Sequence, residues 1–176
     1  MRGRPLAAFF TIITQENTMA ITAPPIQDSR GFFMLPQAPQ ESGYYVYGTP
    51  GNGRGQYAHP GLLSAIFMVE RQWAAINKNK FGIGNISLAG GPRFEGHGTH
   101  KSGLEVDVRP LRKDGEKAAV TRFSQDYDRE ATATLIGLFL ALPSVQLVYF
   151  NDKAITGVRP MPSHDDHFHV LIKVPS

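Results

Sequence analysis

The 176-residue sequence contains no cysteine. Disulfide bonds, thiolate metal sites and cysteine nucleophiles are therefore excluded. Any metal ion bound by side chains must be held by histidine, aspartate or glutamate. The runs of apolar residues are also too short to cross a bilayer, so we predict no membrane span.

Massed positive charge is a second feature that the sequence lacks. The formal net charge is only +3, and the 18 lysine and arginine residues are scattered along the chain. Nucleic-acid-binding domains usually gather these residues into a basic stripe, so we predict no nucleic-acid partner. A weak positive field would suit an anionic polymer, although an equally good interpretation is that it only aids solubility.

The first forty residues have little hydrophobic periodicity and are interrupted by prolines. We interpret residues 1–40 as an N-terminal arm and residues 41–176 as one domain. Arg2 and Arg4 precede a short apolar stretch that weakly resembles a signal peptide, but polar residues follow where a cleavage site is expected. Met19 is an alternative start, which would make the assigned start codon incorrect.

Hydrophobic periodicity predicts two helices, one that begins at Pro60 and closes at residues 78–80, and one over residues 126–142. Short β-prone segments predict strands at residues 44–47, 83–88, 104–108, 145–150 and 167–174. The helices and strands do not alternate in a regular βαβ rhythm. The predicted fold class is therefore α+β, with a central antiparallel sheet flanked by helices.

Histidine is concentrated in two short segments. Five of the six histidines lie in residues 97–107, which also hold Asp107, or in residues 164–169. On a strand, His167 and His169 project from the same face, roughly 7 Å apart along the chain. Two imidazoles on one face, beside acidic residues, can serve one metal ion and one proton transfer.

The first histidine segment supplies a complementary pair of ligands. Asp107 lies on the polar face of its predicted strand, and His100 lies in the loop that leads into it. Gly103 allows that loop to turn back sharply. If the two strands are antiparallel neighbours, His169 completes a set of two histidines and one aspartate, which leaves a fourth position for water. That is the arrangement of a catalytic zinc site rather than a structural one.

An ordinary structural interpretation competes with this one. A single histidine is usually solvated or satisfied by a hydrogen bond, and a terminal histidine-rich segment can bind metal adventitiously. Either segment alone leaves the two interpretations about equal. The presence of both segments, each on a polar β face, favours a metal site.

The motifs resemble a known family. Residues 90–110, GGPRFEGHGTHKSGLEVDVRP, closely resemble the penicillin-insensitive murein endopeptidases, and residues 164–169, HDDHFH, resemble their C-terminal His-x-His motif. These enzymes are related to the lysostaphin-type peptidases, the D-Ala-D-Ala metallopeptidases and the hedgehog signalling domain. The resemblance covers roughly residues 42–173 and implies a hedgehog-like, D-Ala-D-Ala-peptidase-like fold.

The resemblance implies roles for individual residues. His100, Asp107 and His169 would bind Zn²⁺, and His167 would be the catalytic histidine. His164 is a second candidate catalytic residue, which would orient His167 or hydrogen-bond the substrate, and a structural role is an equally good interpretation. It matches a histidine near the site of the family.

Several further residues have weaker roles under the same resemblance. His97 also matches a histidine near the site, and Asp166 is the alternative general base to His167. Thr99 and Glu105 stand where the family often has serine and aspartate, and both keep the chemistry of their positions. Arg109 and Arg159 are candidates for binding substrate carboxylates, although a solvated surface arginine is the favoured interpretation of each.

The function that the resemblance implies is zinc-dependent hydrolysis of peptide cross-links in bacterial peptidoglycan. The expected bond joins D-Ala to meso-diaminopimelate in the stem peptides, which places the protein in the periplasm or delivers it to the cell wall by another route. Alternatives are a D-Ala-D-Ala carboxypeptidase of the same fold, a non-catalytic zinc-stabilised cell-wall-binding module, and a metal-dependent nuclease. Oligomeric state and biological role, whether housekeeping enzyme, phage lysin or exported toxin, stay open.

Overall fold

The computed structural model describes residues 26–37, 39 and 41–174. Its helices and strands, in chain order, are β1 (Phe33–Met34), β2 (Tyr44–Val46), β3 (Tyr57–Ala58), α1 (Pro60–Ile76), β4 (Phe81–Ile83), β5 (Glu105–Val108), α2 (Arg129–Leu140), β6 (Val145–Tyr149), β7 (Val158–Arg159) and β8 (Phe168–Ile172). Six strands form one sheet in the order β2–β4–β5–β8–β6–β7, and β1 pairs with β3 in a second, small sheet. The predicted α+β class is confirmed.

The large sheet is mixed, so the prediction of a central antiparallel sheet is wrong at both edges. Strand β2 runs parallel to β4, and β6 runs parallel to β7. In the first pair, α1 lies between the two strands in sequence and carries the chain back to the same end of the sheet, as a parallel connection requires. In the second pair, residues 150–157 make this return. The central strands β4, β5, β8 and β6 are antiparallel, as predicted.

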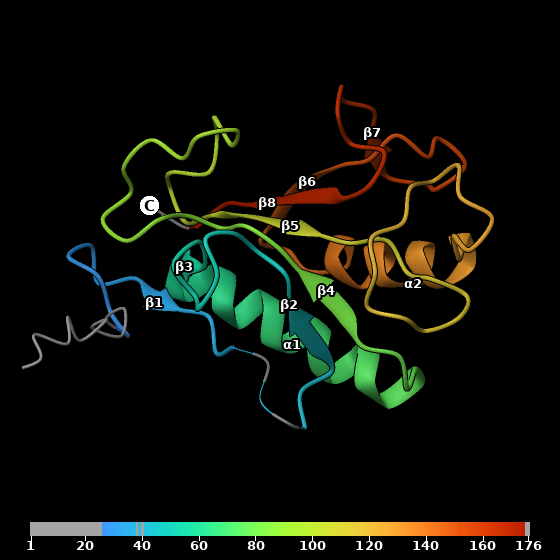
Figure 1. Cartoon of the computed structure of the whole chain (residues 1–176), viewed down its shortest axis with the longest axis horizontal. Helices are drawn as coiled ribbons and strands as arrows, with labels where there is room; N and C mark the ends of the chain where they lie inside the picture. The colour runs from blue at the N-terminus through green and yellow to red at the C-terminus, as the bar shows by residue number, and fades with distance from the viewer. Residues whose placement is uncertain (1–25, 38, 40, 175–176) are drawn as a thin grey trace, which may run out of the picture.

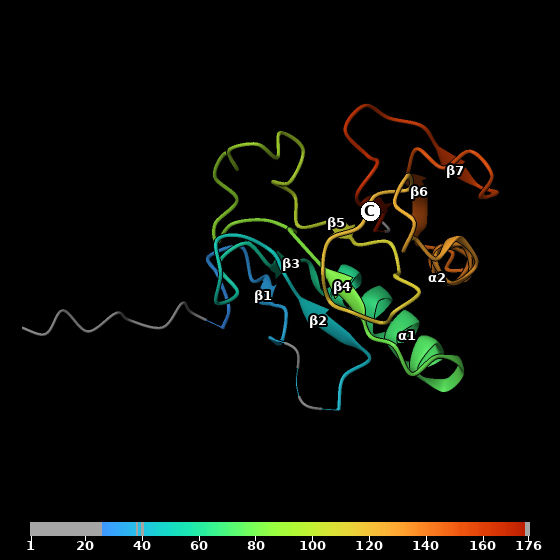
Figure 2. The same cartoon turned by 45° about the vertical axis from the view of Figure 1, so that its right-hand side comes forward.

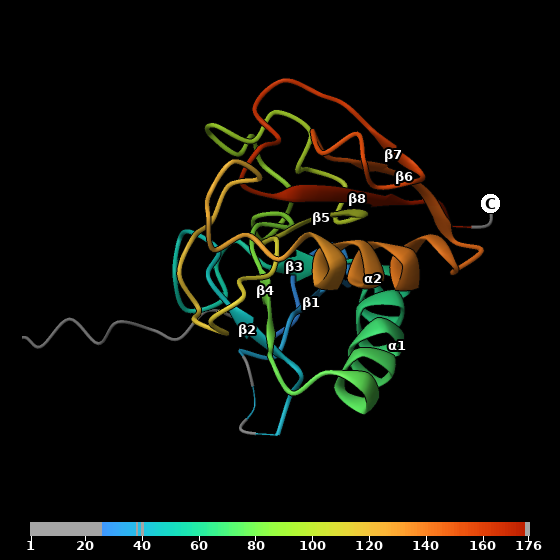
Figure 3. The same ribbon diagram turned by 90° about the vertical axis from the view of Figure 1, so that its right-hand side faces the viewer.

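Helices α1 and α2 both lie on one side of the large sheet (Figures 1 and 3). Helix α1 begins at Pro60, as predicted, and the side chain of its N-cap residue His59 accepts a hydrogen bond from Gly61 N. Helix α2 is shorter than predicted because the carboxylate of Asp128 accepts a hydrogen bond from Ala131 N and caps the helix there. Neither helix is long and apolar enough to cross a membrane, which holds for every helix in the described part of the chain.

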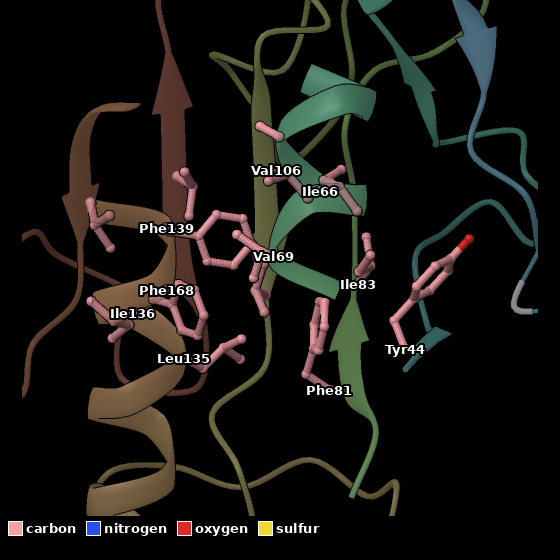
Figure 4. Close-up of a cluster of buried hydrophobic side chains, with 14 of the residues drawn as sticks. Tyr44, Ile66, Val69, Phe81, Ile83, Val106, Leu135, Ile136, Phe139 and Phe168 are labelled. Carbon is pink, nitrogen blue, oxygen red and sulfur yellow. The ribbon is translucent and has the colours of Figure 1, made fainter. Parts of the chain in front are cut away.

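The hydrophobic core lies between this sheet and the two helices (Figure 4). Phe168 of β8 packs edge-to-face against Phe139 of α2, with ring centroids 6.0 Å apart, and Phe139 makes a similar contact with Phe81 of β4. Val106 of β5 is fully buried in the same core. Because successive side chains of a strand point to opposite faces, the residues beside Val106 and Phe168 face away from the helices.

The described part of the predicted N-terminal arm contacts the rest of the protein. Phe33 of β1 pairs with Ala58 of β3, and Leu35 is fully buried. The guanidinium of Arg30 donates hydrogen bonds to the carbonyls of Leu88 and Lys101. The domain boundary after residue 40 stays a prediction, and the signal-like stretch lies outside the described residues.

Candidate metal centre

A pair of neighbouring strands positions two of the predicted ligands. In the antiparallel pair of β5 and β8, Asp107 is the direct partner of His169. Both side chains point to the face opposite the helical core, and both residues are buried, with 4% and 6% of their surfaces exposed. His169 Nδ1 lies 3.1 Å from Asp107 Oδ1. Strand pairing therefore brings together ligands that are 62 positions apart in the sequence.

His100 reaches the same carboxylate from the loop between β4 and β5. Its Nε2 lies 3.1 Å from Asp107 Oδ1, and only 3% of the residue is exposed. Its Nδ1 lies 3.0 Å from the carbonyl oxygen of Ile86 and donates to it, so Nε2 carries the lone pair of the neutral ring. Gly103 has a φ of +66°, and a Cβ there would lie 2.8 Å from the Phe32 ring, which explains why this turn uses glycine.

The loops that precede β5 and β8 lie on the side of the large sheet away from the helices (Figures 1 and 2), and they carry the remaining histidines of the two segments. His97 Nδ1 lies 3.5 Å from Asp107 Oδ2, and His97 Nε2 lies 2.7 Å from Asn85 Nδ2. His167 Nε2 lies 3.8 Å from Asp107 Oδ1. The ring of His164 lies against that of His167, with centroids 4.6 Å apart.

Hydrogen bonds orient His167 and His164 differently. His167 Nδ1 lies 2.8 Å from Asp166 Oδ1 and donates to it, which leaves Nε2 directed at the centre and able to accept a proton. Asp166, the alternative general base, thus contacts the far side of the His167 ring, and 60% of its side chain is exposed. His164 Nδ1 donates to the carbonyl oxygen of Pro162 at 2.8 Å.

One open pocket of about 410 Å³ lies over the centre. The five residues predicted to act at the site all line it, namely His100, Asp107, His164, His167 and His169. A second pocket of about 420 Å³ adjoins the first, and both are lined by His97, Asp107, Ser163 and His167. The structure therefore brings the predicted residues together in a solvent-accessible place that a substrate can reach.

Two overlapping groups of side chains, among the residues that the structure describes, have ligand atoms within 4.8 Å of one another. One group is His97, His100 and Asp107, and the other is His100, Glu105 and His169. The predicted set of His100, Asp107 and His169 takes two members from each group. The choice of ligands among these five residues stays a prediction.

Two distances at Asp107 are close to those between neighbouring ligands of a tetrahedral metal ion. Its Oδ1 lies 3.1 Å from both His100 Nε2 and His169 Nδ1. Ligands that surround zinc tetrahedrally, with bonds of about 2.0–2.1 Å, are about 3.3 Å apart. Two imidazole nitrogens and one carboxylate oxygen also match the donor types that zinc accepts in catalytic sites.

Electrostatics keep the central carboxylate charged. Burial alone would raise the pKa of Asp107, but hydrogen bonds from His100, His169 and His97 hold it well below its usual value. For His100, burial lowers the pKa, and the hydrogen bond to Asp107 outweighs this effect and raises it overall. Burial lowers the pKa of His164, which favours a neutral ring. Asp107 thus carries a negative charge, and a metal ion bound at His100 would have to compete with a proton there.

Glu105 is a member of the site whose position sequence reasoning underrated. Its Oε2 is buried without a hydrogen-bond partner among the described residues, and it lies 3.8 Å from His169 Nε2. An unpaired buried carboxylate oxygen is costly unless it serves a nearby cation or donor. The available signal was its spacing, because Glu105 and Asp107 are two apart and share one face of β5.

An α+β domain with histidines gathered around one buried carboxylate in an open pocket is typical of metal-dependent hydrolases. The chain belongs to the penicillin-insensitive murein endopeptidase family, a family of metallopeptidases, since the model of that family matches residues 37–136, more than half of the sequence. The matched range includes His97, His100 and Asp107 and ends inside α2.

A curated relative supports the same assignment. A protein of Haemophilus influenzae named penicillin-insensitive murein endopeptidase is 27% identical to this chain over 168 residues. The alignment covers 78% of this chain and 58% of the relative. The chain therefore spans less than two thirds of the length of that relative.

Proposed function

We propose that this protein is a zinc-dependent endopeptidase that hydrolyses peptide cross-links of bacterial peptidoglycan, with the D-Ala–meso-diaminopimelate bond as its expected target. The observation that carries the proposal is the convergence of His100 and His169 on Asp107, in a pocket that His167 also lines. Family membership supports murein as the substrate. The proposal includes action at the cell wall or in the periplasm, and a fold shared with the hedgehog and D-Ala-D-Ala peptidase group.

Residues His100, Asp107 and His169 would hold the zinc ion. When bound, zinc polarises the scissile carbonyl and acidifies water. The buried Asp107 contributes one negative charge and offers its oxygen between the two imidazoles. Histidine nitrogens that already accept or donate in fixed directions reorganise little on metal binding, which favours affinity.

His167 would transfer the proton. With Nδ1 bound to Asp166, its Nε2 accepts the proton of the attacking water and later returns it to the leaving amine. Asp166 stabilises the positive charge that His167 gains between these steps. His164 packs on the His167 ring and holds it toward the pocket.

The test is mass spectrometry of purified cross-linked muropeptide dimers after incubation with the protein. Parallel samples contain a chelator, the chelator followed by excess zinc, or the His169→Ala variant. The expected result is conversion of dimers to monomers that chelation stops, zinc restores and the variant lacks. Loss of only a terminal D-Ala would identify a carboxypeptidase instead. Intact dimers with zinc bound to the protein would favour a binding module.

A matched control uses the one histidine outside the two segments. His59 caps α1 through its side chain and does not line either pocket around Asp107. The His59→Asn variant keeps a side chain suited to the N-cap position. It should cleave dimers like the unmutated protein, which would show that losing a histidine as such does not abolish activity.

A further inference from the structure

The second pocket is lined by a positively charged side chain, that of Arg109, which the proposed mechanism does not use. This pocket shares His97, Asp107 and His167 with the metal centre and extends to Tyr47 and Arg109. Arg109 follows β5 directly and is two residues from Asp107, so both side chains leave the chain on the same face. Two residues of extended chain span roughly 7 Å. A group bound at Arg109 therefore lies within about two residues of a scissile bond at the centre.

Contacts on two sides hold the Arg109 guanidinium in place. Its central carbon lies 3.8 Å from the centroid of the Tyr47 ring, so the planar group stacks on the aromatic face. One of its terminal nitrogens donates to the carbonyl oxygen of Lys117 at 3.0 Å. The Tyr47 ring in turn lies on Gly84, where a Cβ would come within 2.7 Å of the ring. The guanidinium is thus oriented before any ligand binds.

The charge of Arg109 has no carboxylate partner among the described residues, although the residue is half-buried. Four other arginines each form an ion pair with an aspartate, namely Arg30, Arg112, Arg122 and Arg129. Asp166 lines the same pocket as Arg109 but is bound to His167. Arg109 therefore keeps unused N–H donors beside the pocket, in the fork geometry that suits a carboxylate.

We propose that Arg109 is a specificity-determining residue that binds a carboxylate of the substrate next to the scissile bond. The inference rests on the proposed peptidase function and specifies its substrate class as peptides that carry a free carboxylate within about two residues of the cleaved bond. Tyr47 acts as the positioning residue of this subsite. Arg159, the other arginine considered from the sequence, lies exposed on β7 and lines neither pocket.

The experiment is isothermal titration calorimetry with two forms of a purified cross-linked peptide dimer. One form keeps its free carboxylates beside the cross-link, and in the other they are converted to carboxamides. The protein is the zinc-loaded His167→Ala variant, which prevents turnover during the titration. We expect the carboxamide form to bind about 10-fold to 100-fold more weakly, as for the loss of one or two charge-assisted hydrogen bonds.

Substitution of Arg109 identifies the group responsible. Arg109→Gln, made in the same background, should bind both forms alike, within about 3-fold, because the carboxamide effect requires the guanidinium. Arg109→Lys keeps the charge without the planar fork and should give an intermediate difference. The matched control Arg159→Gln should keep the full difference. Thermal unfolding of each variant reports whether it is folded.

The outcomes separate this inference from the function on which it rests. Cleavage of the carboxylate dimer by the unmutated protein is measured in parallel. A carboxamide effect that depends on Arg109, without cleavage, supports the subsite and overturns the peptidase. Cleavage with equal affinity for both forms, or a carboxamide effect that persists in Arg109→Gln, overturns the subsite alone. Failure to bind or cleave either dimer overturns both.

Discussion

The candidate centre has a half carried by strands and a half carried by loops, and the two halves differ in burial except at the loop residue His100, which is buried. Asp107 and His169 lie on β5 and β8 and are 4% and 6% exposed. His97 and His167 lie in or at the end of loops, with 30% and 24% of their side chains exposed. A metal ligand gains from burial and rigid placement, whereas a proton-transfer group must reach water and substrate. The roles that we propose for these residues match this difference in exposure.

The two halves are also held by different forces. Register pairing of β5 with β8 fixes Asp107 opposite His169, and a slip of β8 by one residue would turn His169 to the face opposite Asp107. The loops depend on side chains of other segments. The guanidinium of Arg30 binds the carbonyl of Lys101 beside His100, and Arg122 forms an ion pair with Asp165 beside His164. We expect metal binding and proton transfer to separate along this division, with His100 as the one loop residue on the metal-binding side.

The largest effect is expected at the shared carboxylate. Asp107→Asn removes the charge that His100 and His169 both contact, and zinc affinity should fall at least about 100-fold, with loss of activity. Zinc competition titration measures the affinity, and His59→Asn serves as the control. If the variant binds zinc as tightly as the unmutated protein does, the strand half is not the metal site.

A large loss of turnover with little loss of metal is expected in the loop half. His167→Ala should lower kcat by about 10²-fold to 10⁴-fold, as for removal of a general base, and change zinc affinity by less than about 3-fold. Single-turnover cleavage and zinc titration of the same sample measure the two quantities. If both fall together, His167 is a ligand and the division between strands and loops fails.

Glu105 sharpens the comparison within the strand half. Its buried, unpaired Oε2 lies 3.8 Å from His169 Nε2. When a metal ion replaces the proton at Nδ1, this carboxylate would favour the tautomer that carries its proton on Nε2. Glu105→Gln should weaken zinc binding by about 10-fold, the lower end for groups that orient a metal ligand. Glu105→Asp should restore part of this loss, because the carboxylate returns on a shorter side chain. Zinc competition titration of both variants is the measurement, and unchanged affinity in Glu105→Gln would remove this role.

The smallest effect concerns the anchoring of the loop that carries His97 and His100. Burial alone would raise the pKa of Asp28, but hydrogen bonds from Arg30 and from the backbone of Gly90 lower it overall. A carboxyl whose pKa is lower in the folded protein stabilises that state above its unfolded pKa of about 3.9, and this contribution is lost as pH falls through the folded pKa. Asp28→Asn should therefore lower the unfolding temperature at neutral pH. The unfolding temperature of the variant should also fall less steeply with decreasing pH than that of the unmutated protein. Thermal unfolding of both proteins between about pH 6 and pH 2 tests this. If the unfolding temperatures of the variant and the unmutated protein fall in parallel with pH, the prediction is contradicted.

Much of the secondary structure was predictable because its causes are local, although the strand predicted at residues 83–88 is wrong except at Ile83, where β4 ends. The spacing of apolar residues in the 60–76 segment and the proline at its start predict α1, and the alternation around Val106 predicts β5. The parallel edges of the sheet were not predictable in the same way. Whether β2 joins β4 in parallel depends on how α1 packs back on the sheet, and that depends on contacts between distant segments.

The sequence by itself determined which kinds of atoms this site can use. Without cysteine, the donors must be histidine nitrogens and carboxylate oxygens, and strand alternation gives Asp107 a polar face. Only the tertiary structure decided that Asp107 pairs with His169 and that Arg109 stacks on Tyr47. Side-chain direction along a strand is set by adjacent residues, whereas register and stacking are set by the packing of segments far apart in the chain.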